Sequence, residues 1–150
     1  DVVLHAAGRV KHMTVAQNIE YPLRKRGVAR AQRREQVKRA AAQLQLEALL
    51  DFCRRNLNDP ALSPDFVAAQ FGISTRTLHL RFEKLEQTFG RWLLDARLDA
   101  SSNALRNPRQ HACSISKIAY TCGFNDLSHF NKSFRTRFGV SPSEWRAGCA

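Results

Sequence analysis

The stretch Ser114-Ile-Ser-Lys-Ile-Ala-Tyr-Thr-Cys-Gly-Phe-Asn-Asp-Leu-Ser-His-Phe-Asn-Lys-Ser-Phe-Arg-Thr-Arg-Phe-Gly139 decides the fold of this 150-residue chain. Ile115, Ile118 and Ala119 have the spacing of one apolar face of a short helix. Gly123 supplies the positive φ that a tight turn between two helices needs. The stretch therefore predicts a short helix, a glycine turn and a second helix.

The second of these helices has capping residues at both ends and two contrasting faces. Asn125 is a good N-cap, Asp126 suits the positive end of the helix dipole, and Gly139 suits the position after the last turn. An apolar face that packs on the domain would leave a polar, cationic face for the major groove of DNA. Taken alone, the pattern is also that of an ordinary amphipathic helix with a solvated charged face. The apolar face is Leu127, Phe130, Phe134 and Phe138, and the polar face is Ser128, His129, Lys132, Arg135 and Thr136.

The same pattern occurs earlier in the chain. Ser63-Pro64 opens a short helix, Gly72 makes the turn, and Ser74 caps the next helix. Ser74 and Asn125 lie 51 residues apart, so the helix-turn-helix unit is repeated. The apolar face of the earlier second helix is Leu78, Phe82 and Leu85.

One long helix from Phe89 to about Leu105 should join the two copies, and Asn107-Pro108 should end it. The sequence thus predicts an all-α fold in which two helix-turn-helix units are joined by a connecting helix. A basic, mostly helical N-terminal extension should precede them. Five residues of the connecting helix are expected on one of its faces: Trp92, Leu93, Ala96, Ala100 and Ala104.

The extension covers residues 1–46, and the helix-turn-helix domain covers residues 47–150. Residues 1–46 contain ten Lys or Arg against three Asp or Glu. A helix capped by Thr14 should stop at Tyr21-Pro22, because proline lacks an N–H and its ring clashes with the preceding turn. A longer Arg-rich helix should begin near Ala29. Such helices can bind phosphates or anionic lipids, although most are simply solvated.

The bulk composition indicates a partner of opposite charge. The net charge is +11 and the pI is about 10.4, which favours a polyanion such as nucleic acid or an anionic membrane surface. No run of eighteen apolar residues is present, so we expect no membrane span and a cytoplasmic protein. The chain begins with Asp1 and its single methionine is Met13, so we expect a piece of a longer gene product. The cysteines lack zinc spacing and are expected to be reduced thiols without a metal: Cys53, Cys113, Cys122 and Cys149.

Residues 50–146 resemble the C-terminal DNA-binding domain of the AraC/XylS family of bacterial transcription regulators. The most specific part is Ile118-Ala-x-x-x-Gly-Phe-x-x-x-Ser-x-Phe-x-x-x-Phe-x-x-x-Phe-Gly-x-Ser-Pro-x-x-Trp145-Arg146. The resemblance implies a sequence-specific, double-stranded DNA-binding transcription regulator that is not an enzyme and needs no cofactor. In this family the second helix of each unit enters one of two successive major-groove segments, and RNA polymerase is a further partner.

The resemblance also implies which side chains face DNA. Leu80 departs from the family, which often has a basic residue there, so we expect weaker hydrogen-bond readout from the first unit. Asp126 would repel phosphate, so capping competes with a DNA contact. The expected base-reading residues are Arg76, His79 and Leu80 in the first unit and Asn125, Ser128, His129 and Lys132 in the second. The expected phosphate contacts are Arg81, Lys84, Lys117, Arg135 and Arg137.

A second resemblance covers residues 12–51, which are similar to part of the helical subdomain of an ABC-transporter ATPase. The family's Leu-Ser-Gly-Gly-Gln signature should follow soon after Asp51, but Phe52-Cys-Arg-Arg-Asn stands there. No Gly-rich phosphate loop with a lysine is present either, so ATP hydrolysis is not expected. Two alternatives to the regulator follow. One is a fused or truncated, non-catalytic ATPase fragment that acts as an interaction piece, and the other is a basic nucleic-acid binder without sequence preference.

Overall fold

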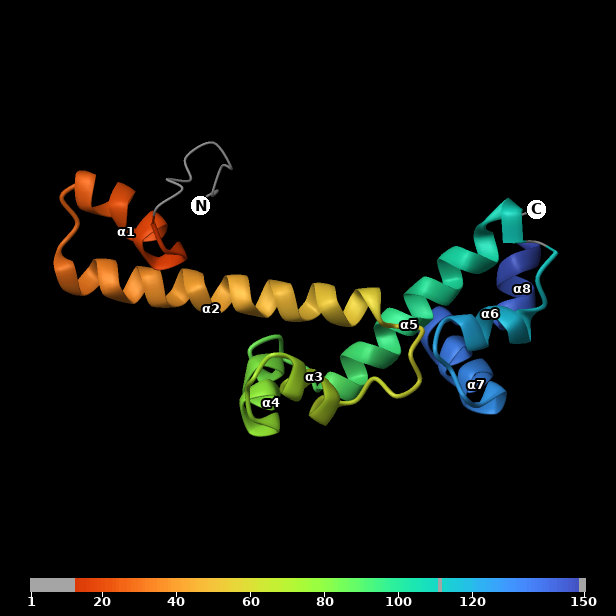
Figure 1. The fold of residues 1–150 in the computed structure, drawn as a ribbon. Helices are drawn as coiled ribbons and strands as arrows, with labels where there is room; N and C mark the ends of the chain where they lie inside the picture. Colours follow the sequence, from red (N-terminus) through yellow and green to blue (C-terminus); the bar gives the residue numbers. More distant parts are fainter. Residues whose placement is uncertain (1–12, 111, 149–150) are drawn as a thin grey trace. The chain divides into compact units, whose positions relative to one another are not determined.

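The computed structural model describes residues 13–110 and 112–148, and over these ranges it is helical with no strand (Figure 1). The predicted all-α class with two helix-turn-helix units is confirmed. None of the described helices combines the length and apolarity needed to cross a bilayer. The helices are α1 Val15–Lys25, α2 Arg30–Arg55, α3 Pro64–Gln70, α4 Thr75–Glu83, α5 Phe89–Arg106, α6 Ile115–Thr121, α7 Leu127–Phe138 and α8 Pro142–Ala147, with a 3-10 turn at Pro108–Gln110.

The chain divides into two compact units, an N-terminal unit Asp1–Ala48 and a C-terminal unit Leu49–Ala150. In the N-terminal unit, the Thr14 hydroxyl accepts from the Gln17 N–H at 3.2 Å, and the Gln17 side chain accepts from the Thr14 N–H at 2.7 Å. The expectation that α1 stops at Tyr21-Pro22 is wrong, because α1 continues to Lys25 with Pro22 inside it. Pro22 lies in the last turns, where its carbonyl still accepts from the Arg26 N–H at 3.2 Å. One missing hydrogen bond is therefore tolerated there.

The first helix-turn-helix unit, α3 and α4, forms as its capping residues predict. Ser63 accepts from the Phe66 N–H at 3.3 Å and Ser74 accepts from the Thr77 N–H at 3.1 Å. Gly72 makes the turn between the helices with φ +59°. Short helices of this length benefit from such caps, because the first four N–H groups of any α-helix lack a partner within the helix.

The second helix-turn-helix unit, α6 and α7, confirms the glycine turn and corrects the N-cap. Gly123 has φ +89° and Gly139 ends α7 with φ +79°. The N-cap of α7 is Asp126, whose carboxylate accepts from the His129 N–H at 2.7 Å, and not Asn125 as predicted. A carboxylate makes the stronger charge-assisted bond at the positive end of the helix dipole.

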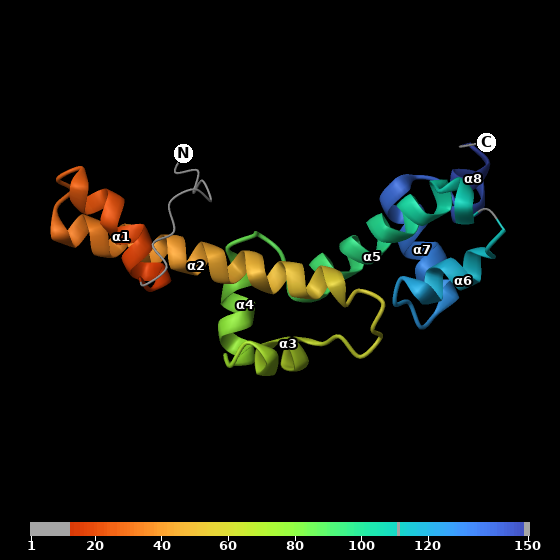
Figure 2. The same cartoon turned by 45° about the horizontal axis from the view of Figure 1, so that its top comes forward.

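The connecting helix α5 buries side chains on two opposite faces, so the face predicted from the sequence is only one of the two. Phe89, Trp92 and Leu93 pack in one core with α2, α3 and α4, whereas Leu98 and Leu105 pack in a second core with α6 and α7. At about 100° per residue, these two sets point about 180° apart. Figures 1 and 2 accordingly show α3 and α4 at one end of α5 and α6, α7 and α8 at the other.

The thiols of the described residues are free, at Cys53, Cys113 and Cys122, while Cys149 lies outside the described residues. Cys53 is fully buried in the first core, and this burial raises the pKa of its thiol to about 11. The neutral thiol is therefore a small apolar core group at ordinary pH.

Helix α8 was not anticipated from periodicity, and it packs on the second half of α5. Ser141 and Glu144 form a capping box, with Pro142 in the first turn. The Trp145 indole N–H donates to the Ser102 carbonyl at 3.3 Å, and the Arg106 guanidinium lies 4.0 Å from the centre of the indole ring. These contacts fix the C-terminal part of the second core.

Arg97, in the middle of α5, joins the two halves of the C-terminal unit. Its Nε donates to the Leu57 carbonyl at 3.0 Å and its Nη2 to the Asp59 carbonyl at 2.7 Å. Burial lowers the pKa of Arg97, while the negative charge of Asp59 acts in the opposite direction. The turn at Gly123 packs against the same carbonyl, since a Cβ at this glycine would lie 2.1 Å from the Leu57 oxygen and 2.7 Å from the Arg97 Nε.

We predict that Gly123→Ala lowers the free energy of unfolding by about 3 kcal/mol or more, because it combines a disfavoured φ with overlap against backbone. Gly72→Ala is the matched control, since Gly72 also has positive φ but a Cβ there meets nothing within 4 Å. The control should cost only about 1–2 kcal/mol. Urea denaturation followed by circular dichroism measures both. Equal losses for the two variants would contradict the close packing at Gly123.

Candidate nucleic-acid interface

Helix α4 places its predicted base-reading residues on one exposed face. At about 100° per residue, Arg76, His79 and Leu80 span about 100° of the helix. All three are exposed, and Leu80 keeps 47% of its surface accessible. Leu78 and Phe82 are fully buried on the opposite side. The start of α4 is also tied to α3, because the Thr75 hydroxyl donates to the Asp65 carboxylate at 2.7 Å.

Helix α7 presents a more polar exposed face than α4. Phe130 and Phe134 are fully buried in the second core, so the opposite face points to solvent. His129 lies beside the Phe124 ring, with 6.5 Å between ring centres, and its Nε2 lies 3.4 Å from the Ser133 hydroxyl. The predicted base-reading residues of this unit are all exposed: Asn125, Ser128, His129 and Lys132.

The residues predicted to contact phosphate differ in their surroundings. Lys84 follows directly after α4 and is exposed, and Arg135 is exposed on α7. Arg81 is half-buried at the edge of the α4 face. Lys117 is exposed on α6, where its backbone N–H bonds to the Ser114 hydroxyl at 3.1 Å.

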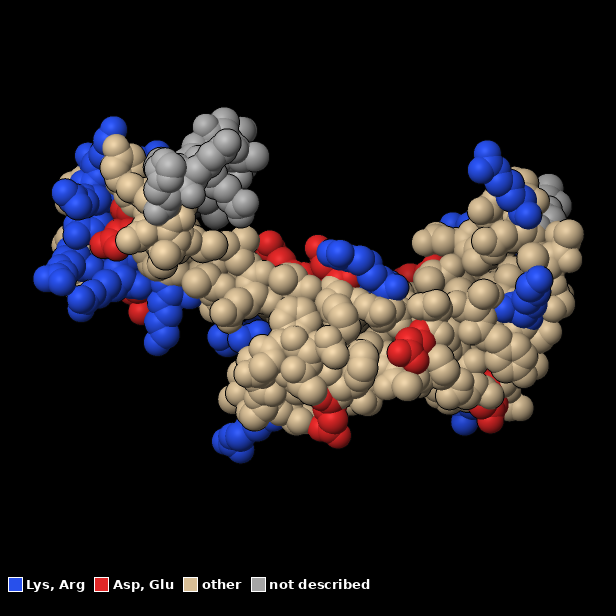
Figure 3. Space-filling model, viewed as in Figure 1, with Lys and Arg blue, Asp and Glu red and all other residues tan. Residues whose placement is uncertain are grey.

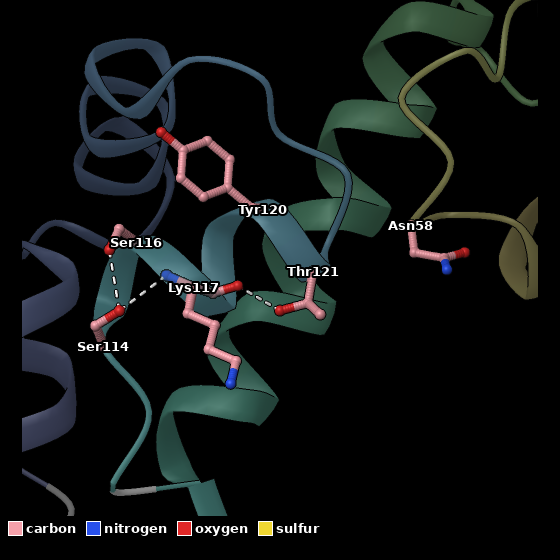
Figure 4. A pocket seen from close by; sticks show the side chains of 6 residues that line it. All are labelled: Asn58, Ser114, Ser116, Lys117, Tyr120 and Thr121. Carbon is pink, nitrogen blue, oxygen red and sulfur yellow. Dashed lines mark hydrogen bonds between the residues drawn. The ribbon is translucent and has the colours of Figure 1, made fainter.

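A shallow pocket of about 540 Å³ lies beside Lys117 (Figure 4). Every lining side chain carries a hydroxyl, amide or amine group that could bind an anionic oxygen, although carbon atoms make up the larger part of the lining surface. In Figure 4 the Ser114 and Ser116 hydroxyls lie next to each other, 3.0 Å apart, and the Lys117 side chain extends beside them. The lining residues are Asn58, Ser114, Ser116, Lys117, Tyr120 and Thr121.

Arg137 is held by carboxylates of α5. Its Nη1 lies 2.6 Å from Asp95 Oδ1, and its Nη2 lies 2.8 and 2.9 Å from the two oxygens of Asp99. Burial acts to lower the pKa of Arg137, but the hydrogen bonds and charges of Asp99 and Asp95 outweigh it and raise the pKa. These ion pairs connect the last turn of α7 to the connecting helix.

Two features of the site were not anticipated from the sequence. The Arg137 ion pairs and the Arg97 hydrogen bonds both join residues about 40 positions apart. Asp95 and Asp99 stand four residues apart on α5, which is the spacing of one helix face, but ordinary surface carboxylates have this spacing as well. No group of three His, Cys, Asp or Glu that could hold a metal ion occurs among the described residues.

The fold and its two exposed helix faces define a double helix-turn-helix domain. A profile of the helix-turn-helix domain family matches residues 67–148. Transcriptional activator RhrA of Rhizobium meliloti (strain 1021) is 40% identical over 92 residues, which are 61% of this chain and 29% of that protein. HTH-type transcriptional activator RhaS of Escherichia coli O1:K1 / APEC is 41% identical over 85 residues, which are 56% of this chain and 30% of that protein.

Solved structures agree with this assignment. A transcriptional regulator from Chromobacterium violaceum, described as an AraC-type DNA-binding domain-containing protein, has a TM-score of 0.66 at 29% identity and covers 74% of this chain and 96% of its own. The DNA-binding domain of AdpA, in complex with a target DNA, has a TM-score of 0.62 at 25% identity and covers 69% and 90%. The chain belongs to the AraC-type helix-turn-helix family. It spans less than a third of the length of the curated relatives RhrA and RhaS.

The corrected N-cap of α7 gives a direct test. Asp126→Ala should lower the free energy of unfolding by about 1 kcal/mol, because the His129 N–H loses its charged acceptor at the helix start. Asn125→Ala is the neighbouring control and should leave stability within about 0.5 kcal/mol of the wild type. Urea denaturation at neutral pH measures both, and a larger loss for Asn125→Ala would contradict the assignment.

Proposed function

We propose that this chain is a sequence-specific, double-stranded DNA-binding transcription regulator that inserts α4 and α7 into successive major-groove segments. The observation that carries the proposal is the pair of capped helices, each with a buried aromatic face and an exposed polar face, held by one connecting helix. The target DNA bound by the AdpA domain supports it, as do the transcriptional activator names of RhrA and RhaS.

The two reading helices contribute differently. In α4, Arg76 makes bidentate contacts to guanine, and the exposed Leu80 side chain contacts a thymine methyl group. His79 contacts the groove edge. At α7 and in the turn just before it, amide, hydroxyl, imidazole and amine groups supply most of the hydrogen-bonded readout: Asn125, Ser128, His129 and Lys132.

Cationic side chains around these helices bind phosphates and set the register on the duplex. Arg81, Lys84, Lys117 and Arg135 take this role, and the hydroxyl groups in the pocket beside Lys117 support it there. For Arg137 we propose another role than the predicted phosphate contact, because Asp95 and Asp99 bind its guanidinium. We assign to Arg137 the positioning of α7 on α5.

The protein acts near promoters in the bacterial cytoplasm, recruits RNA polymerase and performs no catalysis, as membership of this family supports. In-vitro selection from a random duplex pool, followed by titration against selected and scrambled duplexes, tests the proposal. A specific regulator binds its selected site about 10³-fold or more tightly than scrambled DNA. Equal affinity for all duplexes would contradict it and favour a basic binder without sequence preference.

Base contacts are tested by single substitutions. Arg76→Ala and His129→Ala should each weaken the binding free energy by about 1–3 kcal/mol. Each substitution should relax the base preference at one position of the site only. The two affected positions should lie about one helical turn apart, or about 10 bp, because the two helices enter successive groove segments. Affinity measured against duplexes carrying each base at each position provides the readout.

Phosphate contacts should behave differently. Arg135→Ala should weaken binding to all duplexes by a similar factor and reduce the salt slope of log K by about 0.9, the value for one lost phosphate contact. Titrations at several salt concentrations measure this slope. An altered base preference in Arg135→Ala would show that Arg135 contacts a base and not a phosphate.

A further inference from the structure

The N-terminal unit carries much of the positive charge of the chain, and none of the DNA contacts proposed above involves its residues. Residues 1–48 contain ten Lys or Arg and four Asp or Glu, a net charge of +6 out of +11 for the whole chain. Figure 3 shows Lys and Arg side chains gathered where the end of α1, the turn and the start of α2 lie.

Two of the cations are occupied within the unit. Arg33 is only 17% exposed; its Nε lies 3.3 Å from Glu20 and its Nη1 donates to the Val28 carbonyl at 2.7 Å. Arg39 pairs with Glu35 at 2.9 Å on the surface of α2. Arg33 therefore holds α1 against the start of α2, and Arg39 is partly neutralised.

Three further cations form a row along α2. Arg30, Arg34 and Lys38 are spaced by four residues, so they fall within about 80° of the helix and about 6 Å apart along its axis. All three are exposed, and no carboxylate of the described residues is ion-paired with them. We call these residues the cationic row. Arg24, Lys25 and Arg26 lie next to it in sequence, at the end of α1 and its cap.

The residues on the side of α2 opposite the cationic row are too polar for that side to insert into a membrane. That side holds Gln32, Gln36, Arg39 and Gln43, all of them exposed. A helix that lies in a bilayer interface needs bulky apolar residues opposite its basic face. The apolar residues of this part of α2, such as Val37 and Leu44, lie beside the cationic row and not opposite it, so the helix fits a polyanion in water better than a bilayer.

We propose that the cationic row binds phosphates of duplex DNA outside the segment read by α4 and α7, adding affinity without sequence information. This inference rests on the proposed function, because a chain already bound through its helix-turn-helix domain meets neighbouring phosphates at high effective concentration. The cationic row contributes up to three phosphate contacts, and each contact releases condensed counterions.

The test compares the wild type with the variant Arg30→Gln, Arg34→Gln, Lys38→Gln. The selected site is placed in a long duplex and, separately, in a duplex trimmed to the selected bases. On the long duplex, loss of three contacts should reduce the salt slope by about 2.7. A fourfold rise in salt should then weaken the wild type about 40-fold more than the variant. On the trimmed duplex the two proteins should differ little, and base preference should be unchanged.

Two control variants separate charge from structure. Gln32→Ala, Gln36→Ala, Gln43→Ala changes the opposite side of α2 without altering charge and should keep the wild-type slope. The double variant Arg30→Lys, Arg34→Lys keeps the positive charge and should also show the wild-type salt slope. Circular dichroism checks that helix content is the same in every variant, which is expected because all these positions are exposed.

A wild-type slope in the Gln variant on the long duplex would overturn the inference, while continued preference for the selected site would leave the proposed function standing. Equal affinity of the wild type for all duplexes would contradict the proposed function. The salt slopes of the wild type and the Gln variant could then be compared on any duplex, so the inference would still be tested. Binding to phosphatidylserine vesicles that depends on the cationic row, under salt conditions where long DNA is not bound, would overturn the inference in favour of a membrane partner.

Discussion

The arrangement of the two helix-turn-helix units depends on the guanidinium of Arg97. It lies in the middle of α5, donates to two carbonyls of the loop before α3, and packs beside the glycine turn before α7. The Asp59 carbonyl also accepts from the Leu62 N–H at 3.2 Å, whereas the half-buried Leu57 carbonyl takes its hydrogen bond from Arg97. Gly123 is required at the same place because any side chain would occupy the space of the Leu57 oxygen. One polar junction thus joins two apolar cores that lie on opposite faces of α5.

Local signals predicted most of the fold. Ser63, Ser74 and Gly123 have roles that depend on their nearest neighbours in sequence, so caps and turns could be inferred from residue type and spacing. The start of α7 was misplaced by one residue because Asn125 and Asp126 are both good caps, and only the bond to the His129 N–H distinguishes them. Proline inside α1 was tolerated because the helix ends soon after it.

Contacts between distant segments could not be predicted in this way. Nothing near Arg97 in the sequence indicates Leu57 as its partner, and nothing near Asp99 indicates Arg137. The apolar residues of α5 are also numerous enough to be compatible with burial on one face or on two. The base-reading and phosphate-binding residues came from the family resemblance, and the structure adds their exposure and neighbours; their contacts with DNA stay predictions. The likeness of residues 12–51 to an ABC-transporter ATPase subdomain, and a domain boundary near residue 46, also stay predictions.

The two-sided packing of α5 has a consequence for how such proteins diversify. Because the two cores have no residue in common, a substitution that refits α4 to its core leaves the packing of α7 untouched, and the reverse also holds. The one helix between them sets the separation of the two reading faces. Over evolutionary time, each half of a binding site can therefore change its bases independently, whereas the spacing between the halves is inherited unchanged.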